Sequence, residues 1–116
     1  MHFATSAQRL LAALVFLSIA LLAQSHSATL TWTDTANPAG TTYTVKRATG
    51  LCSGTPTFSS IASGITVKTY LDSTVTPGNY CYVVTATFAG IESAASNTAS
   101  APVPSFPPAG LSVTVQ

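Results

Sequence analysis

The stretch YCYVVTATF, residues 80–88, is the clearest strand signal in this chain of 116 residues. Apolar or aromatic side chains occupy every second position in it, and these are Tyr80, Tyr82, Val84 and Ala86. Alternation with a period of two is typical of a strand that buries one face. The Ala89-Gly90 pair that follows is a turn signal, so we predict a hairpin that returns over about residues 93–99.

Four shorter strands are predicted before this hairpin, over residues 29–33, 42–47, 58–61 and 68–71. Leu30 and Trp32 share one face of the first strand, and Tyr43 and Val45 share one face of the second. The region is rich in Thr, Ser, Val and Ile and is divided by Gly and Pro. It shows no apolar residues at helical spacing, which indicates an all-β chain.

Six short strands that each have one apolar face cannot bury that face alone. They are expected to pair into two antiparallel sheets packed face to face. The predicted core residues are Trp32, Tyr43, Val45, Tyr80, Tyr82 and Val84. Such a small core is expected to need covalent support.

The amino terminus has the layout of a secretory signal peptide. Arg9 precedes an uncharged apolar run over residues 10–23, and small and polar residues follow that run. The run is shorter than the roughly 20 residues of a membrane-spanning helix. We therefore predict that residues 1–27 are removed and that the mature chain does not stay in the membrane. Cleavage after Ser27 is preferred, and the alternatives are cleavage after Ser25 and an uncleaved anchor.

The charge balance excludes several classes of partner. The chain carries four basic and three acidic residues, and one of the basic residues, Arg9, lies in the predicted leader. The mature chain is therefore formally neutral and has no polybasic surface for nucleic acid or anionic lipid. We expect no nucleic-acid partner.

The sequence offers no group of catalytic or metal-binding residues. His2 and His26 both precede the preferred cleavage site, so the mature chain lacks a histidine base and the commonest zinc ligand. The three carboxylates, Asp34, Asp72 and Glu92, are expected in separate turns, with roles in turn formation and solubility. Phosphate-binding glycine loops and metal-ligand spacings are absent from the sequence. We predict no enzymatic activity, no cofactor and no metal site.

Together these segments resemble a fibronectin type III domain. The resemblance is carried by TLTWT at residues 29–33, the pattern Tyr43-x-Val45-x-Arg47, PGNY at residues 77–80 and ESAASN at residues 92–97. It implies an all-β, immunoglobulin-like sandwich of two antiparallel sheets over residues 28–101. It also implies that Tyr80 forms a tyrosine corner, in which the hydroxyl bonds the backbone a few residues upstream.

The resemblance also implies a disulfide. Cys52 follows the 42–47 strand and Cys81 lies in the 80–88 strand, and in this fold those two strands are neighbours. A secreted chain with only these two cysteines is expected to join them, and we predict the bond on the outer face of the sheet. Two free thiols and intermolecular pairing are the alternatives.

The first strand of the family fold, strand A, is missing, because the 29–33 strand corresponds to strand B. Residues 102–116 are predicted to be a proline-rich linker followed by a strand, AGLSVTVQ, that resembles strand A. This segment could begin a second repeat, fill the A position of its own domain, add to a sheet edge of another molecule, or remain a flexible tail. The possible interaction residues are Phe106, Leu111, Val113 and Val115.

The resemblance implies a secreted, extracellular or periplasmic, non-catalytic module for binding, adhesion or structure, with an unknown protein or polysaccharide partner. One alternative is an accessory subunit of an exported assembly that donates or accepts a strand, including a strand-swapped homo-oligomer. The other is a small carbohydrate-binding module. Tyr70, Phe88 and Phe106 are the possible surface rings for a sugar.

Overall fold

The computed structural model describes residues 23–116. The strands are β1 (Ala28–Thr31), β2 (Thr42–Thr49), β3 (Ser59–Ile65), β4 (Thr69–Asp72), β5 (Gly78–Phe88), β6 (Ile91–Glu92) and β7 (Ala99–Val103). None of the described residues forms a helix with the length and hydrophobicity needed to cross a membrane. Most of the predicted signal peptide lies outside the described residues.

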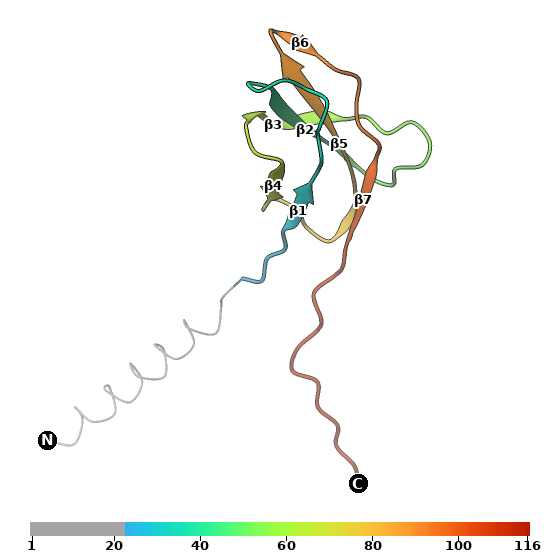
Figure 1. The fold of residues 1–116 in the computed structure, drawn as a ribbon. Helices are drawn as coiled ribbons and strands as arrows, with labels where there is room; N and C mark the ends of the chain where they lie inside the picture. Colours follow the sequence, from blue (N-terminus) through green and yellow to red (C-terminus); the bar gives the residue numbers. More distant parts are fainter. Residues whose placement is uncertain (1–22) are drawn as a thin grey trace, which may run out of the picture.

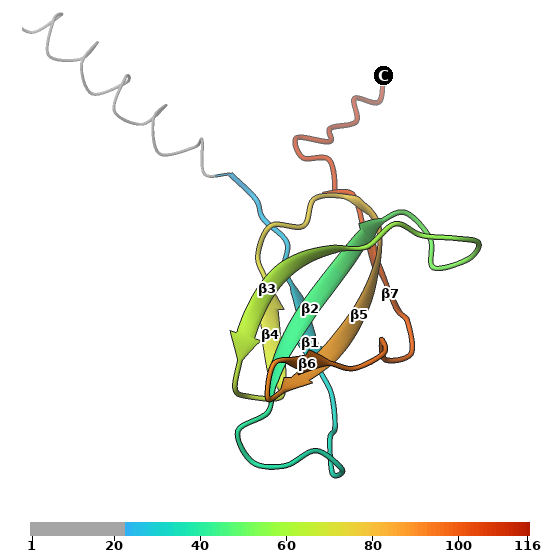
Figure 2. The same cartoon turned by 90° about the horizontal axis from the view of Figure 1, so that it is seen from above.

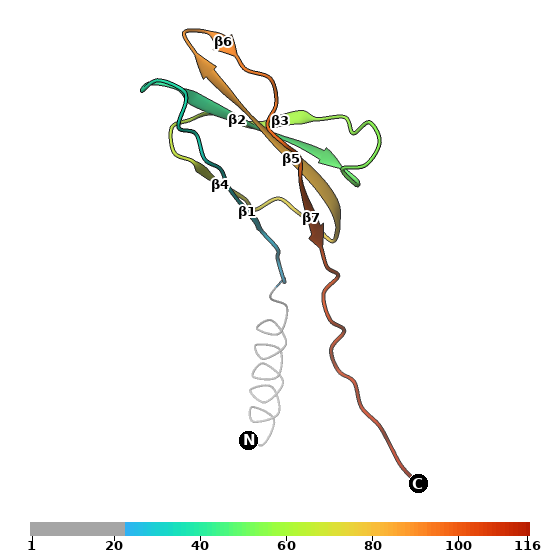
Figure 3. The ribbon, with the colours of Figure 1, turned by 45° about the vertical axis from the view of Figure 1, so that its right-hand side comes forward.

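The strands form two antiparallel sheets that pack against each other (Figures 1 and 2). The smaller sheet contains β1 and β4, and the larger sheet has the order β3-β2-β5-β6, with β7 also paired to β5. Figure 3 shows β1 and β4 as a layer separate from β2, β3 and β5. The predicted all-β sandwich of two antiparallel sheets is confirmed.

The longest strand is β5, which contains the alternating stretch and lies between β2 and β7. It turns back at Ala89 and Gly90, which have φ angles of 51° and 77°. Positive φ at both central residues is the geometry of a tight type I′ hairpin. The predicted turn is confirmed.

The predicted return strand over residues 93–99 is wrong. After the two residues of β6 the chain is irregular, and β7 begins only at Ala99. Two serine hydroxyls explain the interruption, because Ala86 N donates to Ser93 Oγ at 3.0 Å and Val84 N donates to Ser96 Oγ at 2.9 Å. Serine side chains here take the place of the backbone carbonyls that a regular strand would present.

The third strand is longer than predicted. We predicted residues 58–61, whereas β3 continues to Ile65. Its pairing with β2 shifts register between Tyr43 and Val45 and again between Val45 and Lys46. These irregularities break the period-two pattern on which the prediction depended.

The core lies between the two sheets and centres on Val45, Val75, Tyr80 and Tyr82. Trp32 and Val84 are partly buried against this cluster. Tyr43 is buried as well, and its ring lies edge-on to Trp32 with centroids 5.4 Å apart. Val75 was not predicted, because it lies in the loop between β4 and β5, where no strand pattern indicates burial.

The position of strand A is empty among residues 23–116. Within the described part of the chain β1 pairs only with β4, so the edge of β1 that faces away from β4 is open there. The predicted linker begins inside β7, and residues 104–116 form no strand and extend away from the sandwich (Figures 1 and 3). The interpretation that the tail fills the A position of its own domain is therefore wrong for this structure.

Candidate functional site

A hollow of about 280 Å³ lies along the open edge of β1, and we call it the β1 groove. One wall is residues 28–32. The other wall is formed by residues 82–84 of β5, by Ser96 and Asn97, and by residues 99–101. Successive residues of a strand point to alternate faces, so a wall of five consecutive residues shows that the strand presents its edge to the groove.

The β1–β4 pairing determines which backbone groups face the groove. Trp32 N donates to Lys68 O at 3.1 Å, so Trp32 belongs to a hydrogen-bonded pair. In an antiparallel ladder these pairs alternate, so Leu30 also bonds to β4, while Thr29 and Thr31 direct their N–H and C=O groups away from β4. An added strand would therefore find donors and acceptors at Thr29 and Thr31.

The β1 groove is mainly apolar, and none of the side chains that line it is charged. Its apolar lining is Ala28, Leu30, Trp32, Val83, Val84, Ala99 and Ala101. The indole Nε1 of Trp32 is buried and has no hydrogen-bond partner among the described residues. A second hollow of about 210 Å³ shares Trp32, Val84 and Ser96 with the first, so the open edge continues past the end of β1.

A buried carboxylate holds the smaller sheet against the larger one. Asp72, at the end of β4, is only 1% exposed. Its Oδ2 accepts hydrogen bonds from Arg47 Nη1 and from the Tyr82 hydroxyl, each at 2.8 Å. Its Oδ1 accepts from the backbone N and the hydroxyl of Thr74. Because Asp72 is paired with Ala28, this network fixes the position of the first residue of the groove.

The assignment of Asp72 to turn formation and solubility is therefore wrong in part, since the side chain bonds the turn at Thr74 but lies inside the protein. The sequence signal that we missed was the position of Arg47. It lies two residues after Val45 and four after Tyr43, so all three side chains share one face of the strand. A cation on a core-facing position needs a buried counter-ion. Asp72 supplies that counter-ion.

The other end of β1 is held by Asp34. Its Oδ2 accepts from the Tyr43 hydroxyl at 2.8 Å, and its backbone O accepts from Lys68 Nζ at 2.6 Å. Hydrogen bonds from the side chain and backbone of Asn37, and then from Tyr43, hold the pKa of Asp34 well below its usual range. The bond to Asp34 in turn raises the pKa of Tyr43. Together with Asp72, these contacts make the β1 edge a fixed feature.

Acid is expected to weaken the fold through Asp72. Burial by itself would raise the pKa of Asp72, but hydrogen bonds from Thr74, Tyr82 and Arg47 outweigh it and lower the pKa from 3.8 to about 2. Because its pKa is lower in the folded than in the unfolded state, Asp72 stabilises the fold at pH values above its unfolded-state pKa. This stabilisation is lost as the pH falls through the folded-state pKa. Between pH 5 and pH 2, urea unfolding should show a loss of about 2 kcal/mol from this group. The variant Asp72→Asn should show a correspondingly shallower dependence, and an equally steep one would contradict the assignment.

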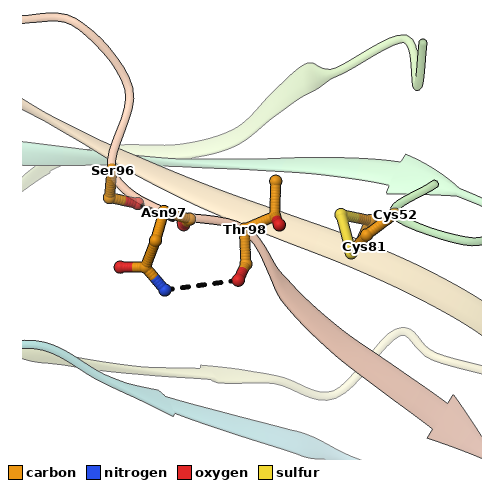
Figure 4. The surroundings of a disulfide bond; sticks show 5 residues. All are labelled: Cys52, Cys81, Ser96, Asn97 and Thr98. Carbon is orange, nitrogen blue, oxygen red and sulfur yellow. Dashed lines mark hydrogen bonds between the residues drawn. A yellow bond between two sulfur atoms is a disulfide. The ribbon is translucent and has the colours of Figure 1, made fainter. Parts of the chain in front are cut away.

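The predicted disulfide between Cys52 and Cys81 is confirmed, with Cα atoms 5.1 Å apart. Figure 4 shows it joining the loop after β2 to β5, with residues 96–98 running alongside β5. Cys81 faces away from Tyr80 and Tyr82, as expected, yet its side chain is fully buried. The bond therefore also seals a small buried area on the outer face of the larger sheet, next to Ala48, which pairs with Cys81.

The tyrosine corner is also confirmed. The Tyr80 hydroxyl accepts a hydrogen bond from Thr76 N at 3.1 Å, four residues upstream, and lies 3.1 Å from Thr76 Oγ1. Arg47 lies over the Tyr80 ring, 5.1 Å from its centroid. These contacts fix the loop between β4 and β5 and thus help to position β5, which contributes residues 82–84 to one wall of the groove.

Removing the Tyr80 hydroxyl is expected to destabilise the fold modestly. The variant Tyr80→Phe leaves Thr76 N without its partner and should lower the free energy of unfolding by about 1–2 kcal/mol. Tyr70→Phe is the matched control, because among the described residues no hydrogen bond is made by the Tyr70 hydroxyl, and its effect should stay within about 0.5 kcal/mol. Equal effects in urea unfolding would show that the corner bond is not the cause.

The carboxyl-terminal candidates are exposed, apart from Phe106. Leu111, Val113 and Val115 are 93%, 81% and 87% exposed. The ring of Phe106 stacks on His26 with centroids 4.2 Å apart and an interplanar angle of 10°. Cleavage after Ser25 would keep His26 and this stack, and cleavage after Ser27 would remove both.

The candidate sugar-binding rings lie on different elements. Tyr70 is on β4 and is packed against the core, Phe88 ends β5 and is 44% exposed, and Phe106 is in the tail. Residues 23–116 contain no group of three or more His, Cys, Asp or Glu side chains that could hold a metal ion. In contrast to these scattered rings, the residues of the β1 groove are brought together by the described fold.

The chain is similar to solved structures, among them the following two. One is the crystal structure of an Fn3-like protein from Clostridium thermocellum, with 37% identity and a TM-score of 0.55, covering 69% of this chain and 79% of that one. The other is the solution structure of a fourth FNIII domain of human origin, with 25% identity and a TM-score of 0.56, covering 72% and 70%. No family model matches the chain, and no curated protein matches it.

Proposed function

This chain belongs to the fibronectin type III family, and on that basis we propose that it is an exported, non-catalytic module that binds a protein partner along the open edge of β1. The partner would add an extended segment beside β1 and place alternate side chains in the β1 groove. Recognition of this kind uses backbone hydrogen bonds for affinity and side-chain pockets for specificity.

The observation that carries the proposal is the unprotected edge of β1. Natural sheets usually protect an edge strand with charged residues, with proline or with a covering segment. Residues 28–32 contain neither a charged residue nor a proline, and β1 has no described neighbour other than β4. An apolar groove beside such an edge supports a binding role for it.

Export is supported by the chemistry of the chain. The disulfide between Cys52 and Cys81 is the kind of bond that forms and persists in oxidising compartments. The apolar run after Arg9 provides the signal that would send the chain there. We therefore place the mature protein outside the cytoplasm, with residues 1–27 as its signal peptide.

A library of immobilised peptides of about 12 residues tests the binding role, since β-strand addition needs only a short extended segment. We expect bound peptides to alternate apolar and polar residues. The variant Thr31→Pro should lose this binding, because it removes an N–H that faces the groove but none that bonds to β4. The matched control Thr31→Ala keeps that N–H and should retain binding.

Two results would overturn the proposal. One is peptide binding that Thr31→Pro leaves unchanged while its circular dichroism and unfolding midpoint match those of the parent protein. The other is binding to an array of polysaccharides with no binding to any peptide, which would favour the carbohydrate-binding alternative.

A further inference from the structure

We propose that the partner at the β1 groove is a second copy of this chain, which inserts residues 111–116 as an added strand. The inference rests on the proposed function, because it names the occupant of the same edge. Each copy would donate its tail to one neighbour and accept a tail from another.

The tail has the pattern of a strand but no sheet to join. In residues 111–116, Leu111, Val113 and Val115 alternate with Ser112, Thr114 and Gln116. The three apolar side chains are 81–93% exposed, and no strand is formed after Val103. Such alternation is typical of a strand with one buried face. The segment is therefore expected to pair with a sheet that can bury its three apolar side chains.

The groove and the tail are compatible in chemistry and in size. Residues 104–116 carry no charged side chain, and none of the side chains that line the groove is charged. Insertion into the β1 groove would therefore remove no ionised side chain from water, and of the two hollows Asp34 lines only the second. A volume of about 280 Å³ is nearly twice the roughly 150 Å³ of an apolar cavity that holds a benzene ring, so it suits two or three aliphatic side chains.

Length also agrees. Six residues in a strand extend about 20 Å, and the four residues of β1 extend about 13 Å. The added strand would cover the whole open edge and reach the second hollow beside Trp32. Along β1 itself, Thr29 and Thr31 would gain the backbone partners that β4 does not provide.

The direction of the tail argues for a second copy over self-insertion. The end of β7 lies near the start of β1, and from that end the tail leads away from the sandwich (Figures 1 and 2). To lie antiparallel to its own β1, the tail would have to place Leu111 beside Thr31, at the far end. The linker over residues 104–110 would then have to run back along the whole length of β1. The chain would reverse direction once at the start of this linker and again at its end.

The composition of that linker opposes such reversals. Three of its seven residues are proline, namely Pro104, Pro107 and Pro108. Proline-rich segments favour an extended, semi-rigid conformation. An extended tail reaches a neighbouring molecule without bending, so the geometry favours exchange between copies.

This mode of assembly has a defined consequence. The two contacting surfaces, tail and groove, are different, so the interface is heterologous and leaves a free tail and a free groove at the two ends of any assembly. The protein should therefore form open, head-to-tail chains whose length rises with concentration.

Analytical ultracentrifugation of the exported protein, with residues 28–116 intact, tests this expectation. The parent protein should sediment as a growing series of oligomers as its concentration is raised. Val113→Asp places a charge in the apolar groove and should shift association to a concentration about tenfold or more higher, equivalent to about 1.4 kcal/mol. Thr114→Asp adds the same charge on the opposite side of the tail and should associate like the parent protein.

Mixing two defective variants gives the sharpest test. Thr31→Pro has an intact tail and a blocked edge, whereas Val113→Asp has an intact edge and a defective tail. At a concentration at which the parent protein associates and Val113→Asp does not, each variant should be monomeric alone, and an equal mixture should form a heterodimer with a single junction. Formation of that dimer by the mixture, and by neither variant alone, is the expected result.

Several results would overturn the inference. They are a parent protein that stays monomeric at every concentration, equal effects of Val113→Asp and Thr114→Asp, and a mixture that remains monomeric. The proposed function is assessed separately, by peptide-library binding to Val113→Asp. If that variant binds peptides while the parent protein never associates, the binding role holds and only the identity of the partner is wrong.

Discussion

Replacing Asp72 with asparagine is expected to lower the free energy of unfolding by about 3–5 kcal/mol, the usual effect of breaking a buried ion pair from one side. Arg47 would lose its counter-ion, and the Tyr82 hydroxyl would lose a charged acceptor. Urea unfolding at pH 7, followed by circular dichroism, measures the change.

The matched control is Glu92→Gln, which removes the other carboxylate that forms an ion pair among residues 23–116. Glu92 bonds to Lys46 at 2.6 Å, but both side chains are partly exposed. Pairs of this kind contribute only about 0.2–1 kcal/mol. If the two variants lose similar free energies of unfolding, Asp72 does not hold the sheets together as we describe.

Loss of the disulfide is the second change with a large expected effect. The bond closes a loop with a sequence separation of 29 residues, and the chain-entropy model assigns such a loop about 3–4 kcal/mol. The double variant Cys52→Ala, Cys81→Ala should lose at least this much, because Cys81 is also fully buried. Domains of this size are stable by only about 5–15 kcal/mol, so much of the margin would disappear.

Reduction of the unchanged protein provides the control for this prediction. Reduction removes the cross-link without creating a cavity, so any excess loss in the double variant reports the packing of Cys81. Thermal or urea unfolding with and without reductant measures both quantities. An unfolding free energy that reductant leaves unchanged, although free thiols are detected, would contradict a stabilising role.

Local sequence pattern predicted those parts of the fold whose side chains alternate without interruption. The stretch at residues 80–88 gave the central strand and its turn, and TLTWT gave the strand whose edge is open. The disulfide and the tyrosine corner were predicted from the family resemblance. The resemblance indicated which distant strands are neighbours in the fold, and local pattern in a single sequence does not indicate this.

The misassigned segments are those in which side chains replace or disturb the backbone ladder. Ser93 and Ser96 take amide hydrogen bonds from β5, so a segment that reads as a strand is irregular. The register shifts at Val45 lengthen β3 beyond its apparent pattern. Such effects depend on the neighbouring strand and leave no local signal.

The candidate site was predictable only in part. The family pattern indicated a vacant strand A and a tail that could occupy it. The far wall of the groove includes Ser96, Asn97 and residues 99–101. Local pattern does not place these residues opposite β1, because only the tertiary fold brings the two walls together. The buried role of Asp72 was missed for a related reason, since its partner Arg47 lies 25 residues away in sequence.

Hydrogen exchange at the backbone amides of Thr29 and Thr31 tests the central claim, that the open edge of β1 receives a strand. In the parent protein at associating concentrations, we expect both amides to exchange about tenfold or more slowly than in Val113→Asp, as paired amides do. The amide of Trp32, which bonds to Lys68 within the chain, should be protected in both proteins. Fast exchange of Thr29 and Thr31 at every concentration, with Trp32 protected, would contradict the account.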